Sequence, residues 1–359
     1  MMIPKLLLVL SFVMYCLFPV NHDSGKVQSF QKMLSHPGLK DEGQQLLSFE
    51  IDKETFRVSS KVASVMCYTN QCKIISVTLV WDRYGNFLKV DIPKGQSLEK
   101  HVDGQTLAFT VKDYKRLSRI LKNDISKLGE LTYNDLQVDE EDLDGYSGAT
   151  RAFIGEKDVV KGATLTCFTL WHWANHPEIK EEIRSQNRKL LTETSSKELL
   201  ASGEKDAQLF VLESLKLSGE CIDVYWNDYI QKANELTNHE MLLLLQLTND
   251  SQRQELLQRL TNVTLRTTVL NYIFSEDDYN ENWLEGIHFN SYLEASKLTD
   301  YLSRNNIDTP NTTSFLVPKL NAENVLISRS IYWYLKSVSH SKQDQKVLKK
   351  YEKKHKKNL

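Results

Sequence analysis

The segment Asp144–Thr150, with the sequence DGYSGAT, holds residue types suited to a ligand-binding turn. Gly145 and Gly148 allow positive φ angles and a close approach of the backbone to a ligand. An apolar helical pattern begins soon afterwards, and backbone N–H groups at a helix start favour a phosphate group. Thr150 adds a hydroxyl, which becomes a nucleophile only when an outside base and metal activate it. The pattern predicts a phosphate-binding turn with an acceptor hydroxyl; the alternative is an ordinary loop that caps the next helix.

These residues resemble the flavin-attachment motif of FMN-binding domains in the periplasmic subunits of sodium-pumping NADH:quinone reductase and of Rnf electron-transport complexes. The family pattern is Asp, two variable residues and Ser/Thr-Gly-Ala-Thr, and a magnesium-dependent flavin transferase joins FMN from FAD to the last threonine as a phosphoester. The resemblance implies that Thr150 is the acceptor. It also implies that the turn is shaped by Ser147, Gly148 and Ala149, and that Asp144 is the leading acid.

The likeness extends diffusely over residues 47–176 and departs from the family directly after the threonine. Family members often carry a small hydroxyl residue within two positions after the threonine, whereas this chain has Arg151 directly after it. Noncovalent FMN binding stays open as a variant, in which the Arg151 guanidinium pairs with the phosphate. A domain that keeps this fold without the cofactor is a further alternative.

Two other groups of residues have types that could do chemistry. His172 and His176 share a helical face, as metal ligands would, but Trp173 stands where a zinc-protease helix carries its glutamate. We therefore expect packing and hydrogen-bonding roles, with proximity of this aromatic helix to an isoalloxazine ring as the alternative. The acidic residues 139–142 fit a solvated loop better than a magnesium site.

Alternating apolar residues predict strands in the region that precedes the motif. Residues 73–82 are β-branched and alternating, residues 83–85 interrupt the pattern, and residues 86–92 resume it, which predicts an antiparallel hairpin. From Thr110, a candidate N-cap, apolar residues return every three or four positions and predict a helix. Strands followed by helices favour an α+β unit.

The rest of the chain has helical periodicity almost throughout. A helix is expected to begin at Pro177, with Asp158 as a possible cap of the helix before it. Between residues 195 and 339 short amphipathic segments alternate with brief polar turns, and no strand is expected. Such segments bury their apolar faces by stacking, so a degenerate HEAT-like array is predicted, with an irregular bundle as the alternative.

The N-terminus is typical of exported proteins. A single lysine precedes an apolar run of 15 residues, Leu6–Val20, which matches a secretory signal and is short for a membrane-spanning helix. An uncleaved anchor stays open. An oxidising compartment would permit a disulfide between Cys67 and Cys72 across a turn, and two unpaired thiols are the alternative.

The charge balance predicts no nucleic-acid partner. Lys+Arg number 45 and Asp+Glu 47, which gives a net charge of −2 and no global field to gather polyanions. The lysine-rich C-terminus, residues 343–359, fits a solvated, fraying tail, with a surface-binding patch as the alternative.

Together these features predict an α+β protein in four parts: a signal peptide or short anchor at 1–20, an FMN-binding-like antiparallel-sheet domain at 26–176, an all-α HEAT-like domain at 177–342 and a basic tail. The first functional hypothesis is an exported flavoprotein that relays electrons outside the cytoplasm, with FMN on Thr150 and with membrane association through the N-terminus as one variant. It implies a flavin transferase for maturation and a redox or envelope partner on the helical domain. The competing hypothesis is a cofactor-free extracytoplasmic interaction scaffold on a related fold. No hydrolase motif is present.

Overall fold

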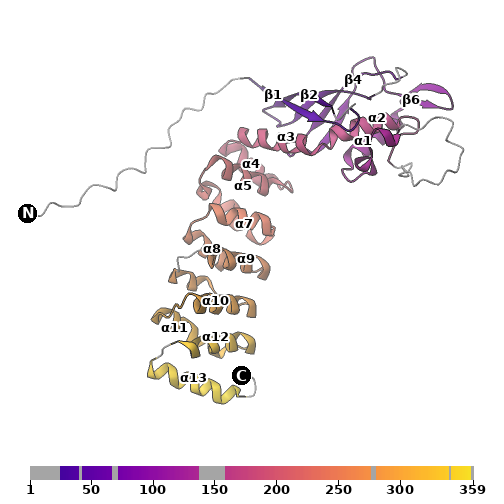
Figure 1. The fold of residues 1–359 in the computed structure, drawn as a ribbon. Helices are drawn as coiled ribbons and strands as arrows, with labels where there is room; N and C mark the ends of the chain where they lie inside the picture. The colour runs from indigo at the N-terminus through magenta and orange to yellow at the C-terminus, as the bar shows by residue number, and fades with distance from the viewer. Residues whose placement is uncertain are drawn as a thin grey trace, which may run out of the picture. The chain divides into compact units, whose positions relative to one another are not determined.

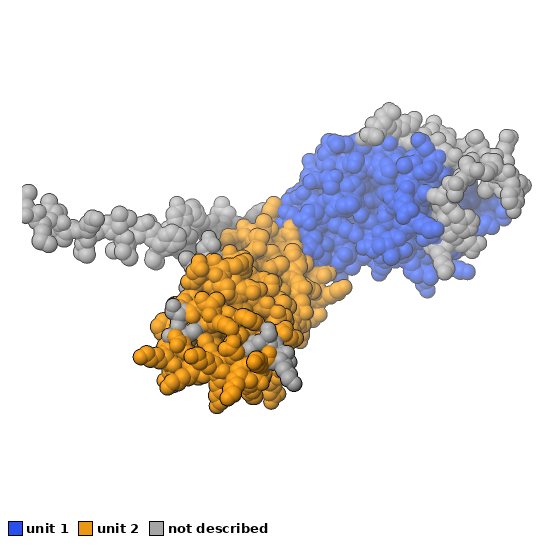
Figure 2. Space-filling view, turned by 60° about the horizontal axis from the view of Figure 1, so that its bottom comes forward, with its two compact units in different colours: residues 1–187 blue, residues 188–359 orange. Residues whose placement is uncertain are grey.

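The computed structural model describes residues 25–39, 43–66, 72–136, 158–275, 280–338 and 341–356. The chain divides into two compact units, residues 1–187 and 188–359 (Figure 2). The first contains an antiparallel sheet with helices, and the described part of the second contains helices alone. The predicted α+β class, with the sheet in the N-terminal part and helices in the C-terminal part, is confirmed.

The sheet is a five-stranded antiparallel meander in which each strand pairs with the next along the chain. The predicted hairpin is confirmed: at its turn the Asp82 carboxylate accepts hydrogen bonds from the backbone N–H groups of Tyr84 and Asn86. Gly85, with φ of 81°, supplies the left-handed residue that this turn needs. The strands are β1 (Val27–Ser35), β2 (Gln44–Asp52), β3 (Val58–Ala63), β4 (Ser76–Trp81) and β5 (Phe87–Asp91).

A separate two-stranded hairpin and three helices complete the first unit. The hairpin is β6 (Glu99–Val102) with β7 (Gln105–Ala108). As predicted, Thr110 caps the first helix, where its hydroxyl accepts from the N–H of Asp113, and the third helix begins at Pro177. The second helix begins at Thr164, so the expectation that Asp158 caps it is wrong. The helices are α1 (Val111–Lys122), α2 (Thr164–Ala174) and α3 (Pro177–Leu190), with short 3-10 turns η2 (Lys127–Glu130) and η3 (Asn134–Leu136).

Helix α2 forms the centre of the core of this unit. Eight of its 11 residues are buried, as expected for a helix that is apolar on all sides. Trp81 of β4 donates its indole N–H to the carbonyl of Ala174 over 2.8 Å, and Trp171 donates to the carbonyl of Asn123 over 2.7 Å. The helix thereby joins the sheet to the end of α1.

The second unit is an array of helical pairs in two layers (Figure 1). Each helix of one layer contacts the next in that layer, which buries apolar faces that no single pair could cover. This layer comprises α5 (Ala207–Ser218), α7 (Asn238–Leu247), α9 (Val263–Ile273), α10 (Tyr292–Arg304), α12 (Val325–Ser337) and α13 (Lys342–His355). The other elements are α4 (Glu193–Ser202), η5 (Ile222–Tyr225), α6 (Trp226–Gln231), η6 (Ala233–Glu235), α8 (Asp250–Arg259), η7 (Glu281–Gly286), α11 (Pro310–Leu316) and η8 (Val317–Asn321).

Side-chain hydrogen bonds connect successive pairs of this array at nearly constant sequence separation. In each bond a carboxylate of one pair accepts from a side-chain amide of the next, 29 or 30 residues further along the chain. We call these bonds the inter-pair ladder. Its members are Asp223 with Gln252, Asp250 with Asn280, and Glu281 with Asn311. The structure thus contains a regular period that the sequence pattern did not reveal.

The basic C-terminal segment is a packed helix rather than a fraying tail. Leu348 and Tyr351 of α13 are buried, and the Tyr351 hydroxyl lies 2.8 Å from the hydroxyl of Ser328 in α12. The Tyr351 ring also stacks on Tyr332, with centroids 5.2 Å apart. Helix α13 therefore closes the end of the array.

Three further observations bear on the expectations about export. The signal-like run Leu6–Val20 lies outside the described residues. Among the helices that the structure describes, none combines the length and the apolar character needed to cross a bilayer. Cys72 is disulfide-bonded, whereas Cys67, its expected partner, is outside the described ranges.

Candidate functional site

The turn singled out by the sequence lies in a part of the chain that the structure does not describe. Asp144, Ser147, Gly148, Ala149, Thr150 and Arg151 all lie outside the described residues, as do the acids 139–142. Leu136, in η3, is the last described residue before this segment, and Asp158, shortly before α2, is the first described residue after it. What the structure does define is the surroundings of α2 and a groove in the helical unit.

The histidines near α2 belong to a cluster of packed rings, in which His36 is buried and His172 and His176 are half-buried. His36, at the end of β1, packs against Trp173 with ring centroids 4.4 Å apart and against His172 at 5.5 Å. His172 in turn contacts Phe168 at 4.5 Å. Trp173 is 0% exposed, so its ring fills the core.

Hydrogen bonds occupy both ring nitrogens of two of these histidines. His36 Nδ1 accepts from the N–H of Gly38 at 2.9 Å, and its Nε2 donates to the carbonyl of Thr169 at 3.1 Å. His176 uses Nδ1 to accept from the N–H of Glu178, and its Nε2 donates to the carbonyl of Ser35 at 3.0 Å. Neither residue retains a lone pair for a metal ion. The structure supports the expected packing and hydrogen-bonding roles.

Burial keeps this cluster uncharged. It lowers the pKa of His36 to about 3 and that of His172 to about 4, because the imidazolium form loses its hydration. Neighbouring histidines lower both values further. His172 hydrogen-bonds the backbone of Leu128, while its Nε2 has no hydrogen-bond partner among the described residues. Within the same part of the chain, no group of three or more His, Cys, Asp or Glu side chains is placed to hold a metal ion.

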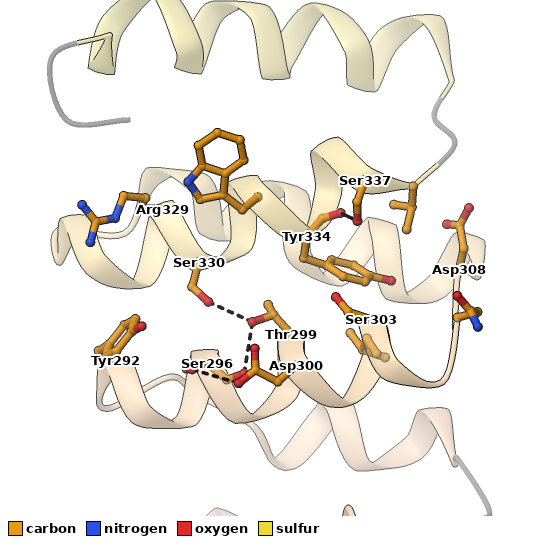
Figure 3. Close-up of a pocket in the computed structure, with 14 residues that line it drawn as sticks. Tyr292, Ser296, Thr299, Asp300, Ser303, Asp308, Arg329, Ser330, Tyr334 and Ser337 are labelled. Carbon is orange, nitrogen blue, oxygen red and sulfur yellow. Dashed lines mark hydrogen bonds between the residues drawn. The ribbon is translucent and has the colours of Figure 1, made fainter.

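A groove of about 1020 Å³ lies along helices α10 and α12 of the helical unit (Figure 3). Both helices present polar side chains to it at helical spacing. Serine, threonine, asparagine and charged groups predominate over apolar ones. The lining residues used below are Tyr292, Ser296, Thr299, Asp300, Arg329, Ser330 and Trp333.

Hydrogen bonds across the groove floor hold the two helices at a fixed spacing. The hydroxyls of Thr299 and Ser330 lie 2.8 Å apart, one from each helix (Figure 3). Beside them Ser296 donates to the Asp300 carboxylate over 3.3 Å. Thr299 is buried and its hydroxyl also donates to the carbonyl of Ala295. The hydroxyls of Thr299 and Ser330 are therefore oriented by these partners.

Two aromatic side chains border the groove with much of their surface in water. Tyr292 of α10 is 43% exposed and Trp333 of α12 is 49% exposed. The ammonium group of Lys336 lies 5.2 Å from the Trp333 ring centre, which restrains the indole through a cation–π contact. Half-exposed, restrained aromatic side chains can contribute binding energy at low entropic cost.

The groove offers charged groups and hydroxyls that can take part in recognition. Asp300 and Arg329 supply opposite charges, and hydroxyls supply donors and acceptors. Sequence reasoning missed this site, because Ser296, Asp300 and Ser303 at helical spacing are indistinguishable from an ordinary solvated face. The one available signal was Trp333, a large aromatic residue on the polar side of its helix.

Comparison with known proteins adds no assignment: no family model, no curated protein and no solved structure matches the chain.

Proposed function

We propose that the protein is an interaction scaffold whose helical unit binds an extended segment of a partner protein in the α10–α12 groove. The groove carries this proposal, because it combines two exposed aromatic rings with a prearranged polar floor. Trp and Tyr are the residues that most often dominate protein–protein binding energies. Arrays of stacked helical pairs present extended binding surfaces of this kind.

The side chains of the groove match the needs of an extended peptide. Such a peptide brings unpaired backbone N–H and C=O groups, which lose free energy unless they find partners. Hydroxyl groups, such as those of Ser296 and Ser303, can donate or accept. Trp333 and Tyr292 provide apolar contact surface on the two sides. Asp300 and Arg329 favour a segment that carries both signs of charge.

Site-specific photo-crosslinking tests the proposal. A photo-reactive phenylalanine analogue at position 333 is expected to give a discrete protein adduct in the native host, whereas the analogue at Leu217, an exposed residue of α5, gives none. Placing the analogue at position 292 should label the same partner, and adding Asp300→Ala should weaken that adduct. Indistinguishable labelling from positions 333 and 217 would contradict a specific groove.

The Asp144–Thr150 motif supports a second candidate function. In this proposal FMN, joined to Thr150 by a flavin transferase, relays electrons outside the cytoplasm, and the flavin supplies the redox chemistry. Asp144, Ser147, Gly148 and Ala149 would form the attachment turn, and Arg151 would pair with the phosphate. The motif, in a chain with a signal-like run at Leu6–Val20, supports this candidate.

Intact-mass analysis and absorption of protein purified from its own host test this candidate. A flavin that survives denaturation, adds the mass of FMN less water and disappears in Thr150→Ala would establish it. A colourless protein without added mass, even after co-expression with a flavin transferase, would refute covalent attachment. The same mass spectrum shows whether the residues up to about position 20 have been removed, which tests the proposed export.

A further inference from the structure

The terminal helix α13 presents a dense set of positive charges to solvent. Lysines at positions 342, 346, 349, 350 and 353 recur at intervals of three or four residues and share one broad face of the helix. Among the described residues 341–356, all seven lysines are exposed. They are Lys342, Lys346, Lys349, Lys350, Lys353, Lys354 and Lys356.

The charges of this face are not neutralised within the described part of the chain. None of the seven lysines forms an ion pair there, whereas Arg188, Lys197 and Arg266 of the same unit are each paired with a glutamate. Both acids of α13 are engaged elsewhere. Asp344 accepts from the Ser341 hydroxyl at the helix start, and Glu352 pairs with Lys336 of α12.

The apolar side of α13 is already occupied. Leu348 and Tyr351 are buried against α12, so this helix has no free apolar face to insert into a lipid bilayer. Its exposed face spans about 21 Å, since a helix rises roughly 1.5 Å per residue over the 14 residues of α13. Any partner must therefore be held by charge, at the surface.

We propose that the basic face of α13 binds an anionic membrane surface through the phosphate and carboxylate headgroups of its lipids. Lysine is a compact point charge without the planar fork that arginine uses for bidentate recognition, so the face suits many mobile headgroups rather than one defined anion. Clusters of four to eight basic residues on a helix bind such surfaces, and each lysine near the surface adds to the attraction. Nucleic-acid sites typically add arginine forks or exposed aromatic rings, and α13 exposes neither.

Vesicle co-sedimentation of the full chain tests this inference. We expect binding to vesicles of phosphatidylcholine mixed with phosphatidylserine, no binding to phosphatidylcholine alone, and loss of binding as salt rises, because surface charges are screened. Changing Lys346, Lys349, Lys350 and Lys353 to glutamine should lower the partition coefficient ~10-fold or more. The matched control changes four exposed lysines of the first unit to glutamine, with the same loss of net charge: Lys112, Lys115, Lys122 and Lys127.

Three results would overturn the inference. The first is equal weakening by the two quadruple variants, which would indicate a net-charge effect. The second is unchanged binding in the α13 variant when its circular dichroism and melting temperature match those of the unmodified chain. The third is tighter binding to a single-stranded oligonucleotide than to phosphatidylserine vesicles at the same salt concentration, which would assign the face to nucleic acid.

Discussion

Arg266 of α9 and Glu294 of α10 form an ion pair that is almost completely enclosed, with side chains 1% and 0% exposed. The guanidinium Nε donates to the carboxylate over 2.6 Å, and Nη1 donates to the carbonyl groups of Leu257 and Leu260. The carboxylate also accepts from the N–H of Asn290 at 2.9 Å. Each charge thus has several partners, which is the condition under which a buried pair is tolerated.

Removing one partner of this pair should destabilise the helical unit strongly. We expect Arg266→Met to lower the free energy of unfolding by about 3–5 kcal/mol, because it leaves a buried carboxylate uncompensated. The double variant Arg266→Met/Glu294→Leu should recover much of the loss. Denaturant unfolding measures both changes. As a control, Arg259→Met removes an exposed ion pair with Glu255 and should lower the free energy of unfolding by less than ~1 kcal/mol. Similar losses in Arg266→Met and Arg259→Met would contradict the importance of burial.

The buried histidines make the stability of the first unit depend on pH. Their folded-state pKa values, about 3 for His36 and about 4 for His172, lie below the ordinary value of 6.5. As pH falls below 6.5 the unfolded chain binds protons that the folded chain cannot, so stability is lost. The loss is at most roughly 1.4 kcal/mol per pH unit for each histidine.

We therefore expect the melting temperature of the first unit to fall steadily between about pH 6.5 and 4. His172→Phe, which keeps a ring beside Phe168, should flatten this dependence. His239→Gln changes an exposed histidine of α7 and should leave it unaltered. Differential scanning calorimetry across this range gives the comparison, and parallel pH curves for the unmodified chain and His172→Phe would count against the explanation.

At the scale of elements, α13 is part of the folded array. Its burial of Leu348 and Tyr351 removes two large side chains from water, each contributing about 1.5–3 kcal/mol. We expect a chain ending at residue 340 to lose ~3 kcal/mol or more of stability in the helical unit and to expose Tyr332. A chain ending at residue 356 should match the full chain. Equal melting temperatures for these two truncations would show that α13 adds no stability, as expected for a fraying tail.

Local sequence signals predicted the elements whose cause is local. The hairpin of β4 and β5 follows from alternating β-branched residues around Gly85, and α1 begins at Thr110 because a hydroxyl there satisfies a free N–H group. Strand β1 was not anticipated. Its residues alternate between exposed and partly covered, and only Leu34 is fully buried, so its identity depends on pairing with β2.

The features that depend on distant partners could not be predicted in the same way. Tyr351 on a lysine-rich helix does not by itself predict that the helix packs. Its contacts with Ser328 and Tyr332 of α12 are visible only in the folded structure. The groove likewise needs Thr299 and Ser330, which are 31 residues apart in the chain. The ladder escaped notice because its members share hydrogen-bonding capacity rather than residue type: aspartate or glutamate on one side, asparagine or glutamine on the other.

At the scale of the whole molecule, the two compact units have separate cores, and different perturbations should destabilise each unit. Calorimetry should resolve two unfolding transitions. Acidification should lower chiefly the one that belongs to residues 1–187, where His36 is buried and His172 is half-buried, whereas Arg266→Met should lower chiefly the other. A single transition that responds equally to both perturbations would show that the units unfold together.

The inter-pair ladder has a mechanical consequence. Each rung joins only adjacent pairs, and the packed helices likewise contact their neighbours along the array, so a pulling force is passed from one pair to the next. Under a pulling force we expect the array to unfold one helical pair at a time. Each step should release about 30 residues, or roughly 100 Å of extended chain. We expect force spectroscopy of the helical unit to record steps of similar length, and a single extension of the whole unit would contradict this.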